Sequence, residues 1–209
     1  MIQKKIPNFL IIGAMKSATT SLYTYLKQHT DIFMPSIKEP MFFNNLNTNQ
    51  HIVLEGRNKK KITSFKKYYD LFQSVKNEIA IGEASPGYLY NKDCASLIKE
   101  HLKNIKIIAV LRQPISRAYS NYLHARRSGK EPIDNFEEAI NNERARIQKN
   151  WSPLYHYLNQ GYYYKHLQRY YQLFPKENIK IILFEELTKN TDESIKDILH
   201  FLQVDNKIP

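Results

Sequence analysis

A short segment near the start of the chain carries one lysine and four hydroxyl side chains directly after an apolar run. The apolar run over 7–12 predicts a strand, and the amphipathic pattern over 19–28 predicts a helix. Backbone N–H groups at the start of a helix lack partners within it and lie at the positive end of its dipole, so they bind anions. We therefore expect a phosphate- or sulfate-binding turn, with Lys16, Ser17, Ala18, Thr19, Thr20 and Ser21 as its candidate residues.

This turn differs from the Walker A loop of enzymes that use ATP. A Walker A loop has glycine, four residues and then Gly-Lys-Ser/Thr, so the lysine comes late and the next hydroxyl binds magnesium. Here Lys16 follows Gly13 by three residues, and Ala18 stands where a second glycine would be expected. An ordinary strand-to-helix turn, capped by Ser17 or Thr19, is the alternative to an anion site.

A second candidate anion site follows another apolar run, at 105–111. Arg112 comes directly after this run, and Pro114 is typical of the first turn of a helix. Ser120 lies about two turns into that helix, on the side that a group held by Arg112 would reach. An arginine fork with a serine hydroxyl binds phosphate, whereas the alternative is a surface ion pair for Arg112 and a backbone hydrogen bond for Ser120. Two such sites at the ends of two strands indicate a ligand with two separated phosphates.

Composition limits the class of protein. The 209 residues, 42% of them hydrophobic, suffice for one core and a single domain over 1–209. The formal net charge of +11 favours an acidic ligand, and nucleic acid, a nucleotide, an anionic glycan and a membrane surface all fit it. No run approaches the ~20 apolar residues of a membrane span, so we expect no stable membrane insertion. A single cysteine, Cys94, suits a reducing compartment, and we expect a cytoplasmic protein.

Short apolar runs rich in β-branched residues alternate with longer helical patterns. Runs that are apolar throughout are typical of a parallel sheet covered on both faces. We expect a three-layer, P-loop-like α/β domain with a central, mainly parallel sheet of about five strands flanked by helices. Ligands then bind at the carboxyl ends of the strands, where Gly13, Glu83 and Arg112 fall. The expected strands are 7–12, 32–34, 79–83, 105–111 and 179–184, and the expected helices are 19–28, 92–102, 115–127, 136–149, 162–173 and 192–202.

These motifs together resemble those of the sulfotransferases that use 3′-phosphoadenosine 5′-phosphosulfate (PAPS), in the branch with bacterial enzymes and heparan-sulfate-type carbohydrate sulfotransferases. The family's 5′-phosphosulfate loop, Lys-x-Gly-Thr-Thr, is similar to 16–20 except at Ala18. Its 3′-phosphate signature, Arg-x-Pro-x-x-Arg-x-x-Ser-x-Tyr, matches 112–122 in full, and its Lys-Glu-Pro-x-Phe-Phe motif matches 38–43. Weaker matches follow in the same order at 161–163 and 174–187.

The sequence departs from the family pattern in three places. Ala18 adds a methyl group where the family's backbone approaches the phosphate closely. Ala84 stands where heparan-type enzymes often carry lysine, which weakens the case for a heparan-like acceptor. The sequence stops at Pro209, before the basic loop that closes over the 3′-phosphate in relatives, so we expect it to lack a C-terminal segment.

The resemblance implies metal-independent transfer of a sulfuryl group from PAPS to a hydroxyl or amine, with a carbohydrate or small polar alcohol as the expected acceptor. It assigns Lys16 to the leaving oxygen and the 5′-phosphate, together with 17–21, and Arg112 and Ser120 to the 3′-phosphate. It assigns Glu39 as the base that takes the acceptor's proton. Pairing of Glu39 with Lys38, or a turn-capping role, is the alternative.

Four residues are weaker candidates for contact with the acceptor. Lys38 precedes the candidate base, and Glu83 and Ser85 end a predicted strand. His124 lies one turn past Ser120 and is a rival base, although a lone histidine is more often structural.

Three other functions compete with this one. A P-loop kinase using Mg-ATP would have a late lysine and a Walker B acid, which the sequence lacks. A nucleic-acid-binding module would suit the charge, but the basic cluster at 57–61 has no interleaved aromatic residues. Retention of Lys16, Glu39, Arg112 and Ser120 argues against a non-catalytic nucleotide binder. The sequence does not predict an oligomeric state.

Overall fold

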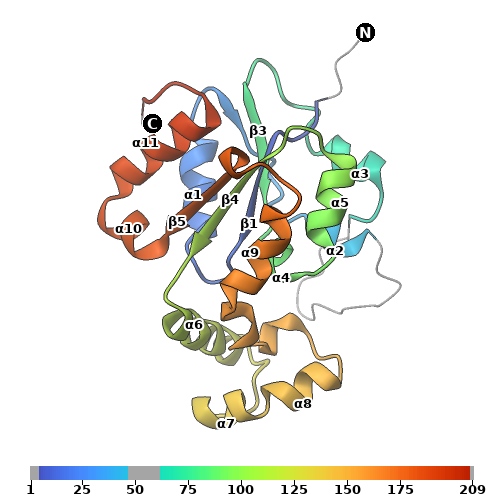
Figure 1. Cartoon of the computed structure of the whole chain (residues 1–209), viewed down its shortest axis with the longest axis vertical. Helices are drawn as coiled ribbons and strands as arrows, with labels where there is room; N and C mark the ends of the chain where they lie inside the picture. Colours follow the sequence, from blue (N-terminus) through green and yellow to red (C-terminus); the bar gives the residue numbers. More distant parts are fainter. Residues whose placement is uncertain (1–4, 47–61, 208–209) are drawn as a thin grey trace.

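Five parallel strands form one central sheet in the order β2-β3-β1-β4-β5 (Figure 1). The computed structural model describes residues 5–46 and 62–207, so the basic cluster at 57–61 lies outside the described residues. The predicted α/β fold with a mainly parallel five-stranded sheet is confirmed. The strands are β1 (Phe9–Gly13), β2 (Ile32–Phe33), β3 (Ala80–Ala84), β4 (Lys106–Leu111) and β5 (Ile179–Leu183).

Helices cover both faces of the sheet, as the apolar strands require. Side chains alternate across β1, so that Leu10 and Ile12 pack on one face and Phe9 and Ile11 on the other, all fully buried. Burying each such side chain contributes roughly 1.5–3 kcal/mol. The first face packs on α2 (Phe42–Asn45), α3 (Phe65–Asp70), α4 (Gly87–Tyr90), α5 (Cys94–His101) and α9 (Tyr163–Tyr171), and the second on α1 (Thr19–Lys27), α10 (Phe184–Lys189) and α11 (Thr191–Leu202) (Figure 1).

A third group of helices lies beyond the end of β4, in the lower part of Figure 1. It has its own small core, built from Ala118, Tyr122, Ala139 and Tyr157. Among the described residues, no helix is both long and apolar enough to cross a bilayer. The group comprises α6 (Pro114–Arg127), α7 (Phe136–Asn141) and α8 (Glu143–Gln148), followed by the 3-10 turns η1 (Pro153–Tyr155) and η2 (Asn159–Gly161), while η3 (Lys176–Asn178) precedes β5.

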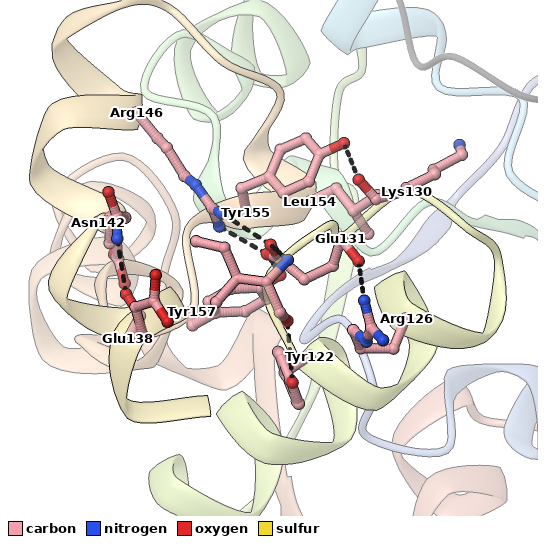
Figure 2. Close-up of polar contacts among 12 residues, drawn as sticks. Tyr122, Arg126, Lys130, Glu131, Glu138, Asn142, Arg146, Leu154, Tyr155 and Tyr157 are labelled. Carbon is pink, nitrogen blue, oxygen red and sulfur yellow. Dashed lines mark hydrogen bonds and ion pairs between the residues drawn. The ribbon is translucent and has the colours of Figure 1, made fainter. Parts of the chain in front are cut away.

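A buried ion pair fastens this third group together (Figure 2). The Glu131 carboxylate accepts from both Nη atoms of Arg146, at 2.6 and 2.7 Å, and from the Tyr157 hydroxyl at 2.6 Å. Arg126, near the end of α6, donates to the Glu131 carbonyl oxygen at 2.6 Å. Burial alone would raise the pKa of Glu131, but the hydrogen bonds from Arg146 and Tyr157 hold it below its usual value. The pair therefore joins the segment that follows α6 to α8 and, through Tyr157, to the segment between η1 and η2.

The observed elements differ from the expected ones in three places. The helix predicted over 136–149 is divided at Asn142, whose side-chain amide donates to the Glu138 carbonyl at 2.9 Å (Figure 2). Such side-chain bonds compete with continuation of a helix. The strand predicted over 179–184 ends at Leu183, because Phe184 begins α10. The short helices α2, α3, α4 and α10 were not predicted, because a helix of one or two turns has too few residues to show a 3.6-residue period.

Glu131→Gln tests the buried pair. The substitution leaves the Arg146 guanidinium buried without a full counter-charge, so the free energy of unfolding should fall by about 3–5 kcal/mol. Urea denaturation measures this loss. Asp134→Asn is the matched control, because Asp134 also pairs with an arginine, Arg126, but its side chain is 84% exposed. That variant should lose less than about 1 kcal/mol, and equal losses in both would contradict the structural role of the buried pair.

Candidate active site

The turn after β1 leaves the first backbone N–H groups of α1 open. The N–H of Ala14 donates to the Val110 carbonyl on β4 at 2.7 Å and fixes the start of the turn. Ala18 precedes the helix, and no side chain caps it. The N–H groups of 19–21 form the first turn and have no intrahelical partners. The backbone of the predicted anion site is thus present, and the alternative of a turn capped by Ser17 or Thr19 is not observed.

Two residues of this turn have left-handed backbone conformations. Lys16 has φ 65° and Ala18 has φ 58°. An L-residue with a Cβ atom pays roughly 1–2 kcal/mol for this conformation, whereas glycine adopts it freely. This explains why the family pattern has glycine at the position of Ala18. Glycine is required at position 13 for a different reason, because a Cβ atom there would lie 2.7 Å from the Leu89 Cβ.

The four hydroxyl residues of the turn divide by exposure. Thr20 and Ser21 are exposed, whereas Ser17 and Thr19 are buried. The Ser17 hydroxyl makes no hydrogen bond of good geometry to any described residue. It lies near the Tyr163 hydroxyl, whose pKa burial raises, and Ser17 slightly opposes that rise. A buried hydroxyl without a partner costs about 1–3 kcal/mol, which an oxygen of a bound anion would recover.

The two predicted anion sites are in direct contact. Arg112 donates from Nη1 to the Lys16 carbonyl at 3.2 Å, and its guanidinium lies 4.5 Å above the Phe184 ring. The Tyr163 hydroxyl donates to the Arg112 carbonyl at 2.8 Å. Ser120 lies two turns into α6 and is half-buried. Arg112 is therefore oriented by the first anion loop, by α10 and by α9.

Lys16 lies within a group of charged side chains. Burial lowers the pKa of its ammonium group, and the positive charge of Arg127 lowers it further. Glu39 acts in the opposite direction, while Arg112 and Lys38 add smaller lowering effects. Because three of these four neighbours are cations, the site has an excess of positive charge that an anionic ligand would neutralise.

Glu39 is paired with the lysine that precedes it. Lys38 Nζ and Glu39 Oε1 are 2.5 Å apart, and the Glu39 side chain is 36% exposed. The Glu39 N–H donates to the Ala84 carbonyl at 3.1 Å, which holds this loop against the end of β3. Phe42 and Phe43, which follow in the same motif, are buried in the core.

Glu83 and Ser85 lie beneath this loop and are fully buried. The Glu83 carboxyl accepts hydrogen bonds from the hydroxyls of Ser85 at 2.9 Å, Tyr88 at 2.6 Å and Tyr68 at 3.3 Å. Burial raises its pKa to about 7, although the three hydrogen bonds act in the opposite direction. Neither side chain reaches the surface, so the acceptor contact suggested by the sequence has no direct route here.

The remaining candidate residue, His124, lies on α6, and exposed tyrosines flank the first residue of α9. His124 is half-buried and Arg127 is exposed at the end of α6. Tyr162 and Tyr164 are 59% and 80% exposed. Phe184, which orients Arg112 together with Tyr163, was not singled out as a site residue in the sequence. The Gly-x-Tyr match indicated Tyr163, but nothing in the sequence indicated Phe184. In the part of the chain that the structure describes, no three His, Cys, Asp or Glu side chains gather to bind a metal ion.

Comparison with known proteins agrees with this geometry. The family model for the sulfotransferase domain matches residues 7–208. The chain belongs to the sulfotransferase family. The resemblance noted from the motifs is thereby confirmed.

Individual relatives cover different shares of the chain. It is 35% identical over 143 residues to the membrane-associated sulfotransferase kil1 of Dictyostelium discoideum, which is 66% of this chain and 28% of that protein. It is 27% identical over 202 residues to mouse heparan sulfate glucosamine 3-O-sulfotransferase 3B1, which is 95% of this chain and 46% of that protein. The chain therefore spans less than half the length of these curated relatives.

Solved structures support the same fold. A sulfotransferase from Alicyclobacillus acidocaldarius superposes with a TM-score of 0.90 at 36% identity, over 98% of this chain and 84% of that one. Mouse sulfotransferase SULT7A1, solved in complex with PAP, superposes with a TM-score of 0.61 at 17% identity, over 95% of this chain and 60% of that one. The second likeness concerns the fold alone.

The buried Glu83 carboxyl predicts a pH dependence of stability. Its pKa rises from an ordinary 4.5 to about 7 on folding, so between these values the folded state holds more protons than the unfolded state. The free energy of unfolding therefore falls as the pH rises, by about 3 kcal/mol in total from this group.

Glu83→Gln should remove that contribution, which urea denaturation at pH 5 and pH 8 would measure. Burial lowers the pKa of His156 to about 4, which acts with the opposite sign but is common to both proteins. The comparison between wild type and variant therefore isolates Glu83, and identical pH dependence in the two would contradict its raised pKa.

Proposed function

We propose that the chain transfers a sulfuryl group from PAPS to a hydroxyl or amine without a metal ion. The hydrogen bond from Arg112 to the Lys16 carbonyl carries this proposal, because it joins two cationic anion-binding positions into one site. A nucleotide with separated 5′ and 3′ phosphates has the charge pattern that such a site complements. Membership of the sulfotransferase family supports the same reading.

The fit of the donor rests on groups that lack partners in the free protein. The open N–H groups of α1 and the buried Ser17 hydroxyl would hold the 5′-phosphate. Arg112, stacked on Phe184, and Ser120 would hold the 3′-phosphate. Exposed Tyr162 and Tyr164 lie close in sequence to Tyr163, which contacts Arg112, and offer ring faces to the adenine.

The donor supplies an activated sulfuryl group on a stabilised phosphate leaving group. Lys16 would donate to the bridging oxygen, where negative charge grows as the S–O bond breaks. Glu39 would accept the proton of the attacking hydroxyl while the new S–O bond forms opposite the leaving oxygen. Lys38, bonded to Glu39, would fix the direction of the carboxylate.

A carbohydrate or small polar alcohol is the proposed acceptor. Several curated relatives are named for heparan sulfate, which supports a sugar hydroxyl or amine as the attacking group. His124 and Arg127, toward the end of α6, are the proposed contacts to the acceptor, and the charge of Arg127 lowers the pKa of Lys16.

Calorimetric titration with 3′-phosphoadenosine 5′-phosphate, without metal, tests the donor site. We expect the bisphosphate to bind and ATP-magnesium to bind at least tenfold more weakly. That ratio corresponds to a difference in binding free energy on the order of 1.4 kcal/mol. Tighter binding of ATP-magnesium would indicate a kinase and overturn the proposal. Failure of both ligands to bind would exclude a nucleotide site in this chain.

Two substitutions separate donor binding from proton transfer. Lys16→Ala should weaken bisphosphate binding by about 10- to 100-fold, because it removes a charge-assisted hydrogen bond. Glu39→Gln should leave that affinity within about twofold and lower turnover of PAPS with a panel of sugar and alcohol acceptors by about 10²–10⁴-fold. Binding is measured by calorimetry and turnover by release of the bisphosphate.

Lys27→Ala is the matched control for Lys16→Ala, since Lys27 carries the same charge but lies in the last turn of α1, at the opposite end of the helix from the Lys16 turn. Its bisphosphate affinity should stay close to that of the wild type. Equal affinity for the bisphosphate in Lys16→Ala and Glu39→Gln would contradict the roles assigned to the two residues.

A further inference from the structure

A buried carboxylate is connected to the loop that carries Glu39 by two hydrogen-bonded branches. In one branch, the Ser85 hydroxyl donates to Glu83 Oε2 at 2.9 Å and accepts from the Met41 N–H at 3.0 Å. In the other, the Tyr88 hydroxyl donates to Glu83 Oε1 at 2.6 Å and accepts from the Phe43 N–H at 3.4 Å. Both branches end on backbone N–H groups two and four residues after Glu39.

The chemistry of a carboxylate fixes the direction of both branches. When ionised, above its pKa of about 7, Glu83 only accepts hydrogen bonds, whereas a hydroxyl has one hydrogen to donate and lone pairs that accept. Ser85 and Tyr88 each direct that hydrogen to Glu83, so their lone pairs remain for the loop. Glu83 therefore orients two hydroxyls as acceptors for the Met41 and Phe43 N–H groups.

The loop needs such anchoring because its backbone is strained. Glu39 has φ 57° and Met41 has φ 53°, both in the left-handed region that residues with a Cβ atom rarely adopt. Such conformations persist only where the surrounding structure holds them. Met41 is the second of these strained residues, and its N–H donates to the Ser85 hydroxyl. This bond restrains the turn directly after Glu39.

We propose that Glu83 is a positioning residue for Glu39, acting through Ser85 and Tyr88. This inference rests on the proposed function, in which Glu39 takes the proton of the acceptor. Glu83 itself is fully buried and touches neither donor nor acceptor. Its effect is to keep the Glu39 carboxylate beside Lys38 and in the electrostatic reach of Lys16.

Tyr68 provides a matched control within the same cluster. Its hydroxyl also donates to Glu83 Oε1, at 3.3 Å, and its ring is buried like that of Tyr88. It contacts the same carboxylate from α3 without accepting from the Met41 or Phe43 N–H, which are bonded to Ser85 and Tyr88. Tyr68→Phe therefore perturbs the buried carboxylate while leaving both branches in place.

Hydrogen–deuterium exchange of the full chain, followed by NMR at single amides, tests the anchoring. Ser85→Ala should speed exchange at Met41 by about fivefold or more and leave Phe43 within about twofold. Tyr88→Phe should do the reverse, and Tyr68→Phe should change neither. Equal acceleration at both amides in all three variants would mean general loosening of the fold and would overturn the proposal.

Kinetics tests the link to catalysis. Ser85→Ala and Tyr88→Phe should each lower kcat for PAPS turnover with the acceptor panel by about tenfold or more, because a misplaced base loses its near-attack geometry. Bisphosphate affinity should stay within about twofold of the wild type, and Tyr68→Phe should retain the wild-type kcat. A kcat loss in Tyr68→Phe equal to that of the other two would overturn the positioning role.

The two proposals fail in different ways. If the wild type neither binds the bisphosphate nor turns over PAPS, the proposed function fails, whatever the exchange data show. If the wild type turns over PAPS but Ser85→Ala and Tyr88→Phe match it in kcat, only the positioning role fails.

Discussion

Parallel pairing of β1 with both of its neighbours is the constraint on which the site depends. β1 bonds to β3 on one side and to β4 on the other, with Leu10 opposite both Glu83 and Ile107. Because the three strands run in the same direction, their carboxyl ends meet at one edge. The anion turn, the buried carboxylate and Arg112 come from these three ends. A shift of one residue in either register would separate them and would turn every core side chain of the strand to the opposite face.

Charge and burial act against each other across this edge. The surface part of the site holds Lys16, Arg112 and Arg127 near one another, and burial together with the two arginine charges lowers the pKa of Lys16. Directly below, Glu83 is a carboxyl in an apolar environment, with hydroxyls but no cation hydrogen-bonded to it in the described contacts. Both arrangements cost stability in the free protein, which is typical of groups arranged for a ligand or a reaction.

Local patterns in the sequence predicted the parts of the structure that local physics determines. Continuous apolar runs identified all five strands, and the Lys16 turn and the Arg112 position were found from residue types that bind anions. Contacts between distant residues could not be predicted in this way. Phe184 stacks on Arg112 from 72 positions away, and Tyr88 reaches Phe43 across 45. The division at Asn142 depends on one side-chain hydrogen bond, which hydrophobic periodicity does not record.

α6 links the ligand-binding edge to the third group of helices, and this has an evolutionary consequence. The helix begins just after Arg112, which bonds to the anion turn, and ends at Arg127, whose charge acts on Lys16. The Glu131–Arg146 pair, together with the bond from Arg126, fixes the end of α6 to α8. A small tilt of α6 about its Arg112 end, produced by substitutions in 128–161, would move Arg127 and change the acidity of Lys16. Descendants of one ancestral gene could thus diverge in reactivity while every residue of the nucleotide motifs is inherited unaltered.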